Sequence, residues 1–329
     1  MTGAGGDVAA GMAAIVIAAA FGGPDVLSII EEPAAEPGPG QARVTLRAAG
    51  VNPADYKAYS GAFGADPARL PVRPGSEAAG VVSAVGPGAP GPTGPAGPVA
   101  VGDEVIAYRV SGAYATELVA PAAALVPKPP ALDWAQAACL MVAGVTAWHL
   151  LAATDVREGD TILIHGGAGG VGLLALQLAS GRGATPVVTA RPTKHGFLRE
   201  LGALPVAYGP GLAGRVRAAA PGGVDAALDL VGTDEALDVS LELVADRARI
   251  ATIAGFARGF REGIKVLGGA PGADPGTQIR DAARLELTRL AAARALRVFV
   301  TQTFPLDKAA EAHRAVMTGH TTGKIALIP

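Results

Sequence analysis

The chain has 329 residues, half of them apolar and only 4% aromatic, and its 27 basic and 29 acidic residues leave a net charge of −2. This balance excludes the broad basic surface that nucleic-acid binding requires, and the length predicts two domains of about 150 residues. A single cysteine, Cys139, excludes an intramolecular disulfide framework and any site built from several cysteines, and it fits a reducing, cytoplasmic compartment.

The N-terminal segment is apolar but has neither the pattern of a signal peptide nor that of a membrane span. No Lys or Arg precedes Arg43, so the basic region of a signal peptide is absent. The uncharged run of residues 8–24 is shorter than the ~20 residues that cross a bilayer. We therefore expect a buried strand at residues 13–20, preceded by an extension without fixed structure, with Met12 as an alternative start.

Short β-like runs separated by glycine and proline follow, and they predict a small β-barrel or sandwich. These runs are residues 42–48, 79–85, 104–108 and 113–119. Residues 86–98 are almost all glycine, proline and alanine, and their four glycine triplets are too few for a collagen helix. We expect a long surface loop there.

From Asp133 onward, helical and strand-like segments alternate. Residues 133–154 predict a helix capped by Asp133. Apolar strands that alternate with helices are typical of a parallel sheet covered on both faces. The predicted strands are 161–165, 185–190, 205–208, 225–231 and 249–254, and the helices between them are 171–180, 194–201, 212–219 and 234–245. A tail of two helices (277–295 and 306–318) and two strands (297–304 and 324–328) is expected to return to the first domain.

The strongest local motif is a glycine-rich turn between a predicted strand and a predicted helix. Residues 162–172 read ILIHGGAGGVG and contain G-x-G-x-x-G at Gly167, Gly169 and Gly172, with Gly170 and Val171 in the same turn. These glycines permit a tight turn, close approach of backbone N–H groups to a pyrophosphate, and close packing of helix on strand. The motif predicts a dinucleotide site; the alternative is a glycine turn that binds no ligand.

The end of the next predicted strand favours NADPH over NADH. An NAD site usually has an Asp or Glu here to hold the ribose 2′-hydroxyl. This segment has no acid before Glu200 and offers Arg191 and Lys194 instead, which would suit a 2′-phosphate. The alternative is that both are solvated surface cations.

Several motifs in a fixed order resemble the zinc-independent quinone oxidoreductases of the medium-chain dehydrogenase/reductase superfamily. They are AGVNPAD (49–55), PGSEAAG (74–80), VGDEV (101–105), GVTAW (144–148), the glycine turn and TGKIAL (322–327). The resemblance implies an α/β protein with a GroES-like β-barrel domain, residues 1–132 completed by 278–329. A Rossmann domain with a doubly wound parallel sheet, residues 133–277, would bind NADPH. The resemblance also implies an active cleft between the domains and a homodimer.

Two positions separate the chain from the zinc-dependent relatives. Those relatives have a cysteine ligand where this chain has Asn52 and a histidine ligand where it has Ser76. A zinc site needs three or four Cys, His or carboxylate ligands, and the five histidines are scattered singly. We therefore expect no metal.

The resemblance also implies roles for individual residues. Asn52 would lie near the nicotinamide, and Lys57 and Tyr59 would donate to a developing oxyanion. The alternatives are a turn residue before Pro53 and two residues at the rim. Ser76 and Glu77 would brace the cleft. The remaining candidates would line the cofactor groove: Val145, Thr146, Tyr208, Val231, Gly232, Ile253, Ala254 and Gly255.

Without a Lewis acid, a hydride donor favours acceptors that are already electrophilic, such as quinones and conjugated enones. We therefore expect an NADPH-dependent quinone or enone oxidoreductase acting on a small molecule. An enoyl-thioester reductase is one alternative, but no Lys/Arg cluster in the first domain indicates the basic channel it needs. A catalytically weak NADPH-binding sensor or structural protein is another.

Overall fold

The computed structural model describes residues 11–88 and 91–329. Nearly all of the predicted N-terminal extension, residues 1–10, therefore lies outside the described residues. The chain divides into two compact units, the first comprising residues up to Val142 with Thr288–Arg294 and Val300–Pro329, the second Ala143–Leu287 with Ala295–Phe299. The predicted domain limits at residues 132 and 277 precede the transitions at 142 and 287 and stay a prediction.

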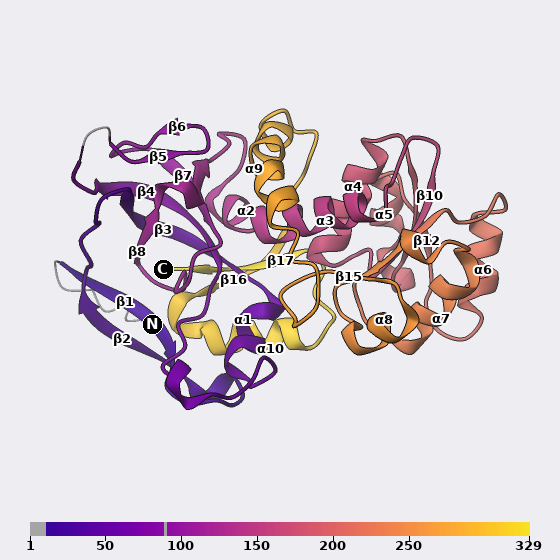
Figure 1. Ribbon diagram of the computed structural model, residues 1–329, viewed down its shortest axis with the longest axis horizontal. Coiled ribbons are helices and arrows are strands. Elements are labelled where there is room, and N and C mark those ends of the chain that lie inside the picture. Colours follow the sequence, from indigo (N-terminus) through magenta and orange to yellow (C-terminus); the bar gives the residue numbers. More distant parts are fainter. Residues whose placement is uncertain (1–10, 89–90) are drawn as a thin grey trace. The chain divides into compact units, whose positions relative to one another are not determined.

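The frame of the first unit is a seven-stranded sheet. The C-terminal strand, yellow in Figure 1, runs antiparallel beside β3 with Ala326 opposite Gly50, so the end of the chain completes this unit. The strand order is β16 (Val300–Pro305), β17 (Lys324–Ile328), β3 (Gln41–Val51), β4 (Glu77–Val85), β7 (Glu104–Tyr108) and β9 (Leu125–Pro127), with β8 (Glu117–Pro121) paired to β3.

Two hairpins and several short helices complete the first unit. A hairpin of β5 (Thr93–Gly94) and β6 (Gly97–Pro98) lies inside the predicted loop 86–98, of which residues 89–90 are outside the described part. The other elements are β1 (Met12–Ala18), β2 (Leu27–Pro33), η1 (Pro24–Val26), α1 (Pro53–Tyr59), η2 (Pro67–Arg69), η3 (Ala122–Ala124), α2 (Trp134–Ala138), η6 (Leu306–Lys308) and α10 (Ala309–Met317).

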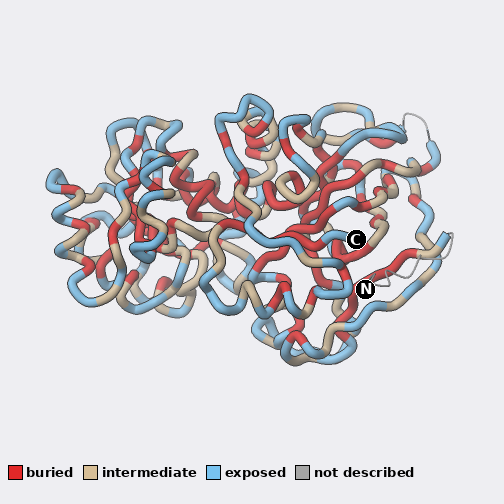
Figure 2. The backbone as a smooth tube through the Cα atoms, turned by 180° about the vertical axis from the view of Figure 1, so that it is seen from behind, coloured by how far each residue is buried: buried red, intermediate tan, exposed pale blue. Residues whose placement is uncertain are grey.

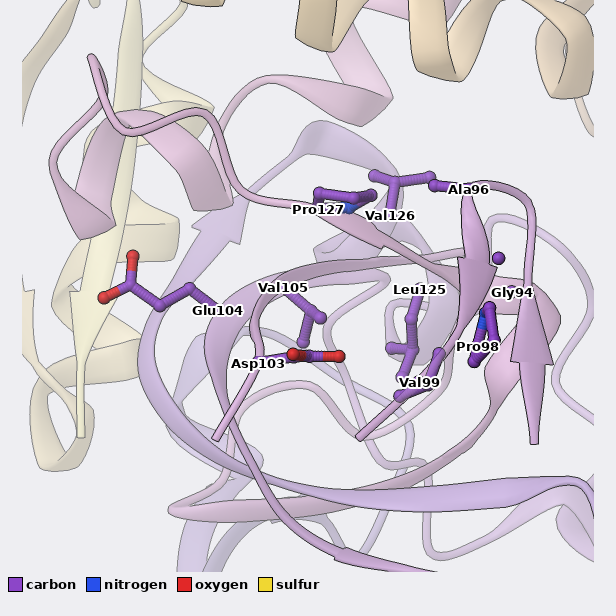
Figure 3. A pocket seen from close by; sticks show the side chains of 11 residues that line it. Gly94, Ala96, Pro98, Val99, Asp103, Glu104, Val105, Leu125, Val126 and Pro127 are labelled. Atoms are coloured by element: carbon purple, nitrogen blue, oxygen red, sulfur yellow. The ribbon is translucent and has the colours of Figure 1, made fainter. Parts of the chain in front are cut away.

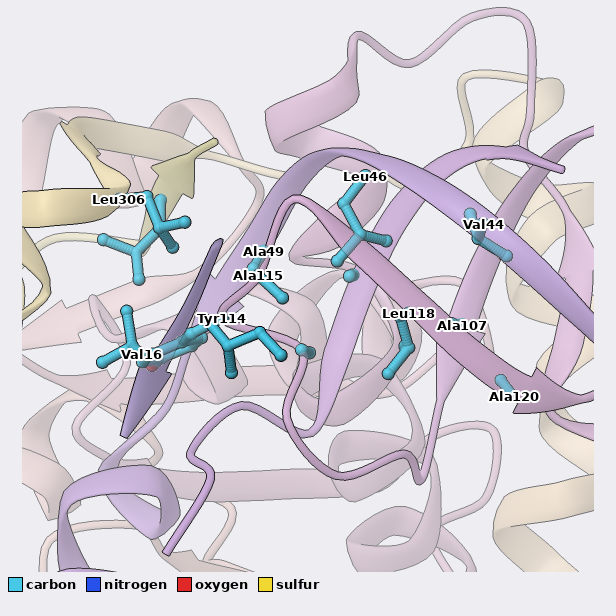
Figure 4. Packing of buried hydrophobic residues seen from close by; sticks show 14 of the residues in the cluster. Val16, Val44, Leu46, Ala49, Ala107, Tyr114, Ala115, Leu118, Ala120 and Leu306 are labelled. Atoms are coloured by element: carbon cyan, nitrogen blue, oxygen red, sulfur yellow. The ribbon is translucent and has the colours of Figure 1, made fainter. Parts of the chain in front are cut away.

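The core of the first unit is built mainly from small apolar side chains. In β3 the side chains of Ala42, Val44 and Leu46 are buried in alternation with more accessible neighbours, as the two-residue period of a strand requires. Tyr114 and Leu306 pack into the same cluster (Figure 4). In Figure 2 the buried segments of the chain, drawn red, lie mainly inside the fold, and the exposed segments, drawn pale blue, lie mostly at its edges.

The second unit contains a six-stranded sheet in which every neighbouring pair is parallel. Its order, 3-2-1-4-5-6 along the chain, is that of the doubly wound Rossmann fold and confirms the predicted fold class. In that order the strands are β12 (Leu204–Val206), β11 (Thr185–Thr189), β10 (Thr161–His165), β13 (Ala226–Asp229), β14 (Ile250–Thr252) and β15 (Lys265–Val266). The helices are α3 (Met141–Ala153), α4 (Gly170–Ser180), η4 (Pro192–Lys194), α5 (His195–Glu200), α6 (Leu212–Ala219), α7 (Asp234–Leu243), η5 (Arg247–Arg249), α8 (Phe256–Glu262) and α9 (Thr277–Ala292), of which α3 and α9 cross the limit between the units.

The structure corrects the expected helix at residues 133–154, which is interrupted at Cys139 and Leu140. Asp133 caps only the first part, α2, by accepting from the N–H of Gln136 at 2.8 Å. The second part, α3, has its Val142 N–H bound by a carboxylate oxygen of Glu77 at 2.7 Å. This distant carboxylate, which favours a helix N-terminus at this point, has no signal in the local sequence.

Candidate functional site

The glycine turn that follows β10 contains two glycines that packing requires, Gly167 and Gly172, and one that packing does not require, Gly169. A Cβ at Gly167 would lie 2.5 Å from the Val188 Cβ, and one at Gly172 would lie 2.4 Å from the Gly166 oxygen. At Gly169 the nearest neighbour is the Gly166 oxygen at 3.5 Å, which is ordinary contact. The space above Gly169 therefore remains open to a ligand.

Helix α4 begins at this open point. Its first bond of the helical pattern runs from the Leu173 N–H to the Gly169 carbonyl at 2.9 Å. The N–H groups of Gly170, Val171 and Gly172 precede it and have no acceptor within the helix. Three donors without an intrahelical acceptor, at the positive end of a helix dipole, can bind a phosphate, so the residues present fit a dinucleotide pyrophosphate.

The other predicted cofactor residues of the second unit, except two, follow the carboxyl ends of neighbouring parallel strands. Ligands of open parallel sheets bind at this edge, next to the point where the strand order reverses. Arg191 and Lys194 follow β11, Tyr208 follows β12, Val231 and Gly232 follow β13, and Ile253, Ala254 and Gly255 follow β14. The exceptions, Val145 and Thr146, are buried in α3, and their position beside a nicotinamide stays a prediction.

The loop that carries Tyr208 is held by one guanidinium. Arg215 donates to the carbonyl oxygens of Ala207, Gly209 and Pro210 at 2.7–2.9 Å. Tyr208 is 50% exposed. Arg191, at the end of the neighbouring strand, is also exposed, and Lys194 is half-buried. Two cations and an aromatic ring thus lie at the ends of adjacent strands, where they could hold a phosphorylated ribose and a base.

In the first unit, Asn52 belongs to a buried ion-pair cluster. The ammonium of Lys324 donates to Asn52 Oδ1, to Glu77 Oε1 at 3.1 Å and to the Val51 carbonyl at 3.0 Å. Asn52 Nδ2 donates to the same Glu77 oxygen at 3.0 Å. Although burial lowers the pKa of Lys324, its neighbours, with Glu77 the largest contributor, more than offset this, and the pKa lies above its usual value. The Asn52 amide is therefore held in one orientation and is only 4% exposed.

A second chain of buried hydrogen bonds begins at Asp55. The Tyr114 hydroxyl donates to Asp55 Oδ2 at 2.9 Å and also lies 2.9 Å from His313 Nε2. Burial lowers the pKa of His313 to about 4, so its ring is neutral at pH 7. Because the one proton of Tyr114 goes to Asp55, His313 Nε2–H must donate to Tyr114. His313 Nδ1 then accepts from Tyr59.

The predicted catalytic residues Tyr59 and Lys57 lie in different environments. Tyr59 is fully buried with its hydroxyl bound to His313, whereas Lys57 is half-buried and, among the described residues, has no side-chain hydrogen bond or ion pair. Ser76 donates to Asp55 Oδ1 at 3.3 Å. Sequence reasoning missed Asp55, although it ends the AGVNPAD motif and accepts from the Asn52 N–H at 2.8 Å. It also missed Tyr114 and His313, which come from distant segments and carry no local signal.

Two buried neutral histidines predict a loss of stability in mild acid. Burial lowers the pKa of His165 and of His313 from 6.5 to about 4. Between these pH values the unfolded chain binds more protons at both sites, so the free energy of unfolding falls as the pH falls. Burial raises the pKa of Asp55 from 3.8 to about 6, and this group acts with the opposite sign. Together these three groups should take up about one proton on unfolding near pH 5, or about 1.4 kcal/mol per pH unit. Burial also lowers the pKa of His149, which adds to the slope with the same sign.

Urea unfolding between pH 6.5 and 4.5 measures this slope. The variant Asp55→Asn removes the group that acts with the opposite sign. The free energy of unfolding should then fall more steeply as the pH falls, with an uptake of nearly two protons on unfolding. A flat profile, or one in which stability rises as the pH falls, would contradict the assignment of two neutral buried histidines.

No metal cluster is present in the part of the chain that the structure describes: no group of three or more His, Cys, Asp or Glu side chains could hold an ion. Asn52 and Glu77 bind the Lys324 ammonium instead. The expected absence of zinc stays a prediction that rests on this donor set.

A cavity of about 190 Å³ lies elsewhere in the first unit, between the β5–β6 hairpin, β7 and β9 (Figure 3). Its acidic residues are engaged, since Asp103 accepts from the Ala100 N–H at 2.8 Å and Glu104 pairs with Lys128 at 3.0 Å. None of the predicted site residues lines it.

Comparison with known proteins confirms the resemblance. Residues 38–130 match the alcohol dehydrogenase GroES-like domain, and residues 201–327 match a family described as zinc-binding dehydrogenase. A quinone oxidoreductase from Pseudomonas aeruginosa is 35% identical over 330 residues, which cover 94% of this chain and 98% of the relative. The rat synaptic vesicle membrane protein VAT-1 homolog is 37% identical over 218 residues, which cover 64% of this chain and about half (52%) of that protein.

A solved structure shows the same likeness. The Escherichia coli quinone oxidoreductase in complex with NADPH is 28% identical and superimposes with a TM-score of 0.81, covering 96% of this chain and 100% of its own. Among residues 11–88 and 91–329, every helix is too short or too polar to span a membrane.

Proposed function

Because the chain belongs to the quinone oxidoreductase family of the medium-chain dehydrogenase/reductase superfamily, we propose that it reduces a quinone or a conjugated enone with NADPH, without zinc. The observation that carries the proposal is the glycine turn at Gly169, together with Arg191 and Lys194 after the next strand and no acid between that strand and Glu200. The NADPH complex of the E. coli relative supports the choice of cofactor.

Different residues of the chain would bind different parts of NADPH. When bound, NADPH supplies a hydride. The N–H groups of Gly170 to Gly172 hold the pyrophosphate, and Arg191 and Lys194 hold the 2′-phosphate. We propose Lys57 rather than Tyr59 as the donor to the developing oxyanion, because the Tyr59 hydroxyl is buried against His313. A homodimer, which the resemblance implies, and a cytoplasmic location, which the single cysteine suggests, remain predictions.

Cofactor choice gives the first test. The double variant Arg191→Ala/Lys194→Ala should raise the KM for NADPH by about one to three orders of magnitude, since two charge-assisted contacts of roughly 1.5–3 kcal/mol each are partly screened by solvent. The KM for NADH should stay nearly unchanged because its ribose lacks the phosphate. Steady-state kinetics with both cofactors measures the two effects. An equal loss for both cofactors, or no loss, would contradict 2′-phosphate recognition.

The acceptor requires a separate experiment. NADPH oxidation should be measured with a panel of quinones, conjugated enones and enoyl thioesters. Turnover of quinones or enones supports the proposal, whereas turnover of enoyl thioesters alone would favour the reductase alternative. Tight NADPH binding with no turnover would indicate a sensor or structural protein.

A further inference from the structure

The last residues of β13 and β14 form a buried side-chain pair. Asp229 and Thr252 are direct partners in the parallel register, and both are fully buried. The Thr252 hydroxyl donates to Asp229 Oδ2 at 2.6 Å. Burying a carboxylate costs free energy unless its oxygens accept hydrogen bonds. Packing alone therefore does not explain an aspartate at this position.

The Asp229 carboxylate also binds the loop that follows its own strand. Its second oxygen, Oδ1, accepts from the N–H groups of Val231 at 3.1 Å and Gly232 at 2.8 Å. Its neighbour in the register on the other side is His165, whose pKa burial lowers to about 4. No cation therefore faces Asp229 from that strand at pH 7, and the loop amides and the Thr252 hydroxyl are its donors.

Thr252 binds the loop that follows β14 in the same way. Its hydroxyl oxygen accepts from the N–H groups of Ala254 at 3.1 Å and Gly255 at 2.9 Å. Because its only proton goes to Asp229, the direction of every bond in the group is fixed. Four backbone amides in two loops are thus held by two side chains.

The two loops also touch directly. Gly232 has a φ of +72°, and a Cβ there would lie 2.9 Å from the Ala254 carbonyl carbon and from the Gly255 nitrogen. A Cβ at Gly255 would lie 3.3 Å from Asp229 Oδ2. A side chain at either glycine would therefore push the loops apart, and rotation of either loop would break the hydrogen bonds to Asp229 or Thr252.

We propose that Asp229 and Thr252 are positioning residues that hold the loops Val231–Gly232 and Ile253–Gly255 as one rigid wall of the dinucleotide groove. The inference rests on the proposed function, since these loops are its predicted cofactor contacts. The loops follow β13 and β14, whereas Arg191 and Lys194 follow β11 on the far side of β10. Loss of the Asp229–Thr252 hydrogen bond should therefore weaken the binding of NADPH and of NADH to the same extent.

Three variants and a control test this role. Asp229→Asn places an amide N–H₂ group against N–H or O–H donors, and Thr252→Val removes the hydroxyl, whereas Thr252→Ser keeps it. Thr154→Val is the matched control, because Thr154 is a fully buried threonine of the same unit whose hydroxyl donates to the Leu150 carbonyl at 2.8 Å. The readouts are Kd for NADPH and for NADH by fluorescence titration, and Tm.

Asp229→Asn and Thr252→Val should raise both Kd values by about tenfold or more, because a binding site works only when its groups are held within about 0.5 Å of the productive geometry. Thr252→Ser should stay within about threefold of the wild type, and Thr154→Val should lower Tm without changing Kd. Unchanged Kd values in folded variants, or a loss for NADPH alone, would overturn the inference. If the wild type binds neither cofactor, the proposed function itself fails.

Discussion

Gly169→Asp is expected to raise the Kd for NADPH by at least about 100-fold, equivalent to about 2.7 kcal/mol, while leaving the protein folded. Gly169 is the N-cap of α4, with φ −76° and ψ 171°, a conformation that Asp adopts readily. An Asp at an N-cap accepts from the first amides of its helix and stabilises it. Those amides are the donors proposed for the pyrophosphate, so the new carboxylate both occupies them and repels the ligand.

Two alanine variants serve as controls in opposite directions. Gly169→Ala meets only the Gly166 oxygen at 3.5 Å and should fold and bind NADPH within a few-fold of the wild type. Gly172→Ala would bring a Cβ to 2.4 Å from the same oxygen and should lower Tm. Fluorescence titration with NADPH and thermal unfolding separate the two effects. If Gly169→Asp bound NADPH as the wild type does, the turn would have only a structural role.

The Rossmann unit was the easier part of the fold to predict. Its strands are buried on both faces, so they appear as apolar runs, and glycines mark the turns after them. The predicted strand 161–165 and helix 212–219 match β10 and α6 at both ends. Two short helical and strand elements are absent from the prediction. Helix α1 has Asn52 as its N-cap and Pro53 at its first position, a helix-start signal that the prediction did not use, and β15 has only two residues.

The buried polar clusters of the first unit could not be predicted from the local sequence. Asn52, Glu77 and Lys324 are far apart along the chain, and only the antiparallel pairing of β3 with β4 and β17 brings them together. A lone lysine in the apolar segment TGKIAL is compatible with either an exposed strand edge or a buried ion pair. Burial and partner, which decide its role, are tertiary properties.

Lys324→Met is expected to lower the free energy of unfolding by about 3–5 kcal/mol, because it leaves a buried carboxylate without its charge partner. Glu77 is fully buried, and Lys324 is 7% exposed with all three ammonium protons directed at acceptors. Methionine fills a similar volume but donates nothing to Glu77 or Asn52. Urea unfolding at pH 7 measures the change.

A double-mutant cycle with Glu77→Gln separates this charge effect from packing. The double variant should be more stable than the sum of the single losses predicts, with a coupling energy of about 1–3 kcal/mol, because it removes both charges together. The surface pair Lys308–Glu311, half-exposed on both sides, is the matched control, and Lys308→Met should change stability little. If Lys324→Met cost less than about 1 kcal/mol, or if the cycle were additive, the Lys324 ammonium would not be compensating the Glu77 charge. The fixed orientation of the Asn52 amide would then need another cause.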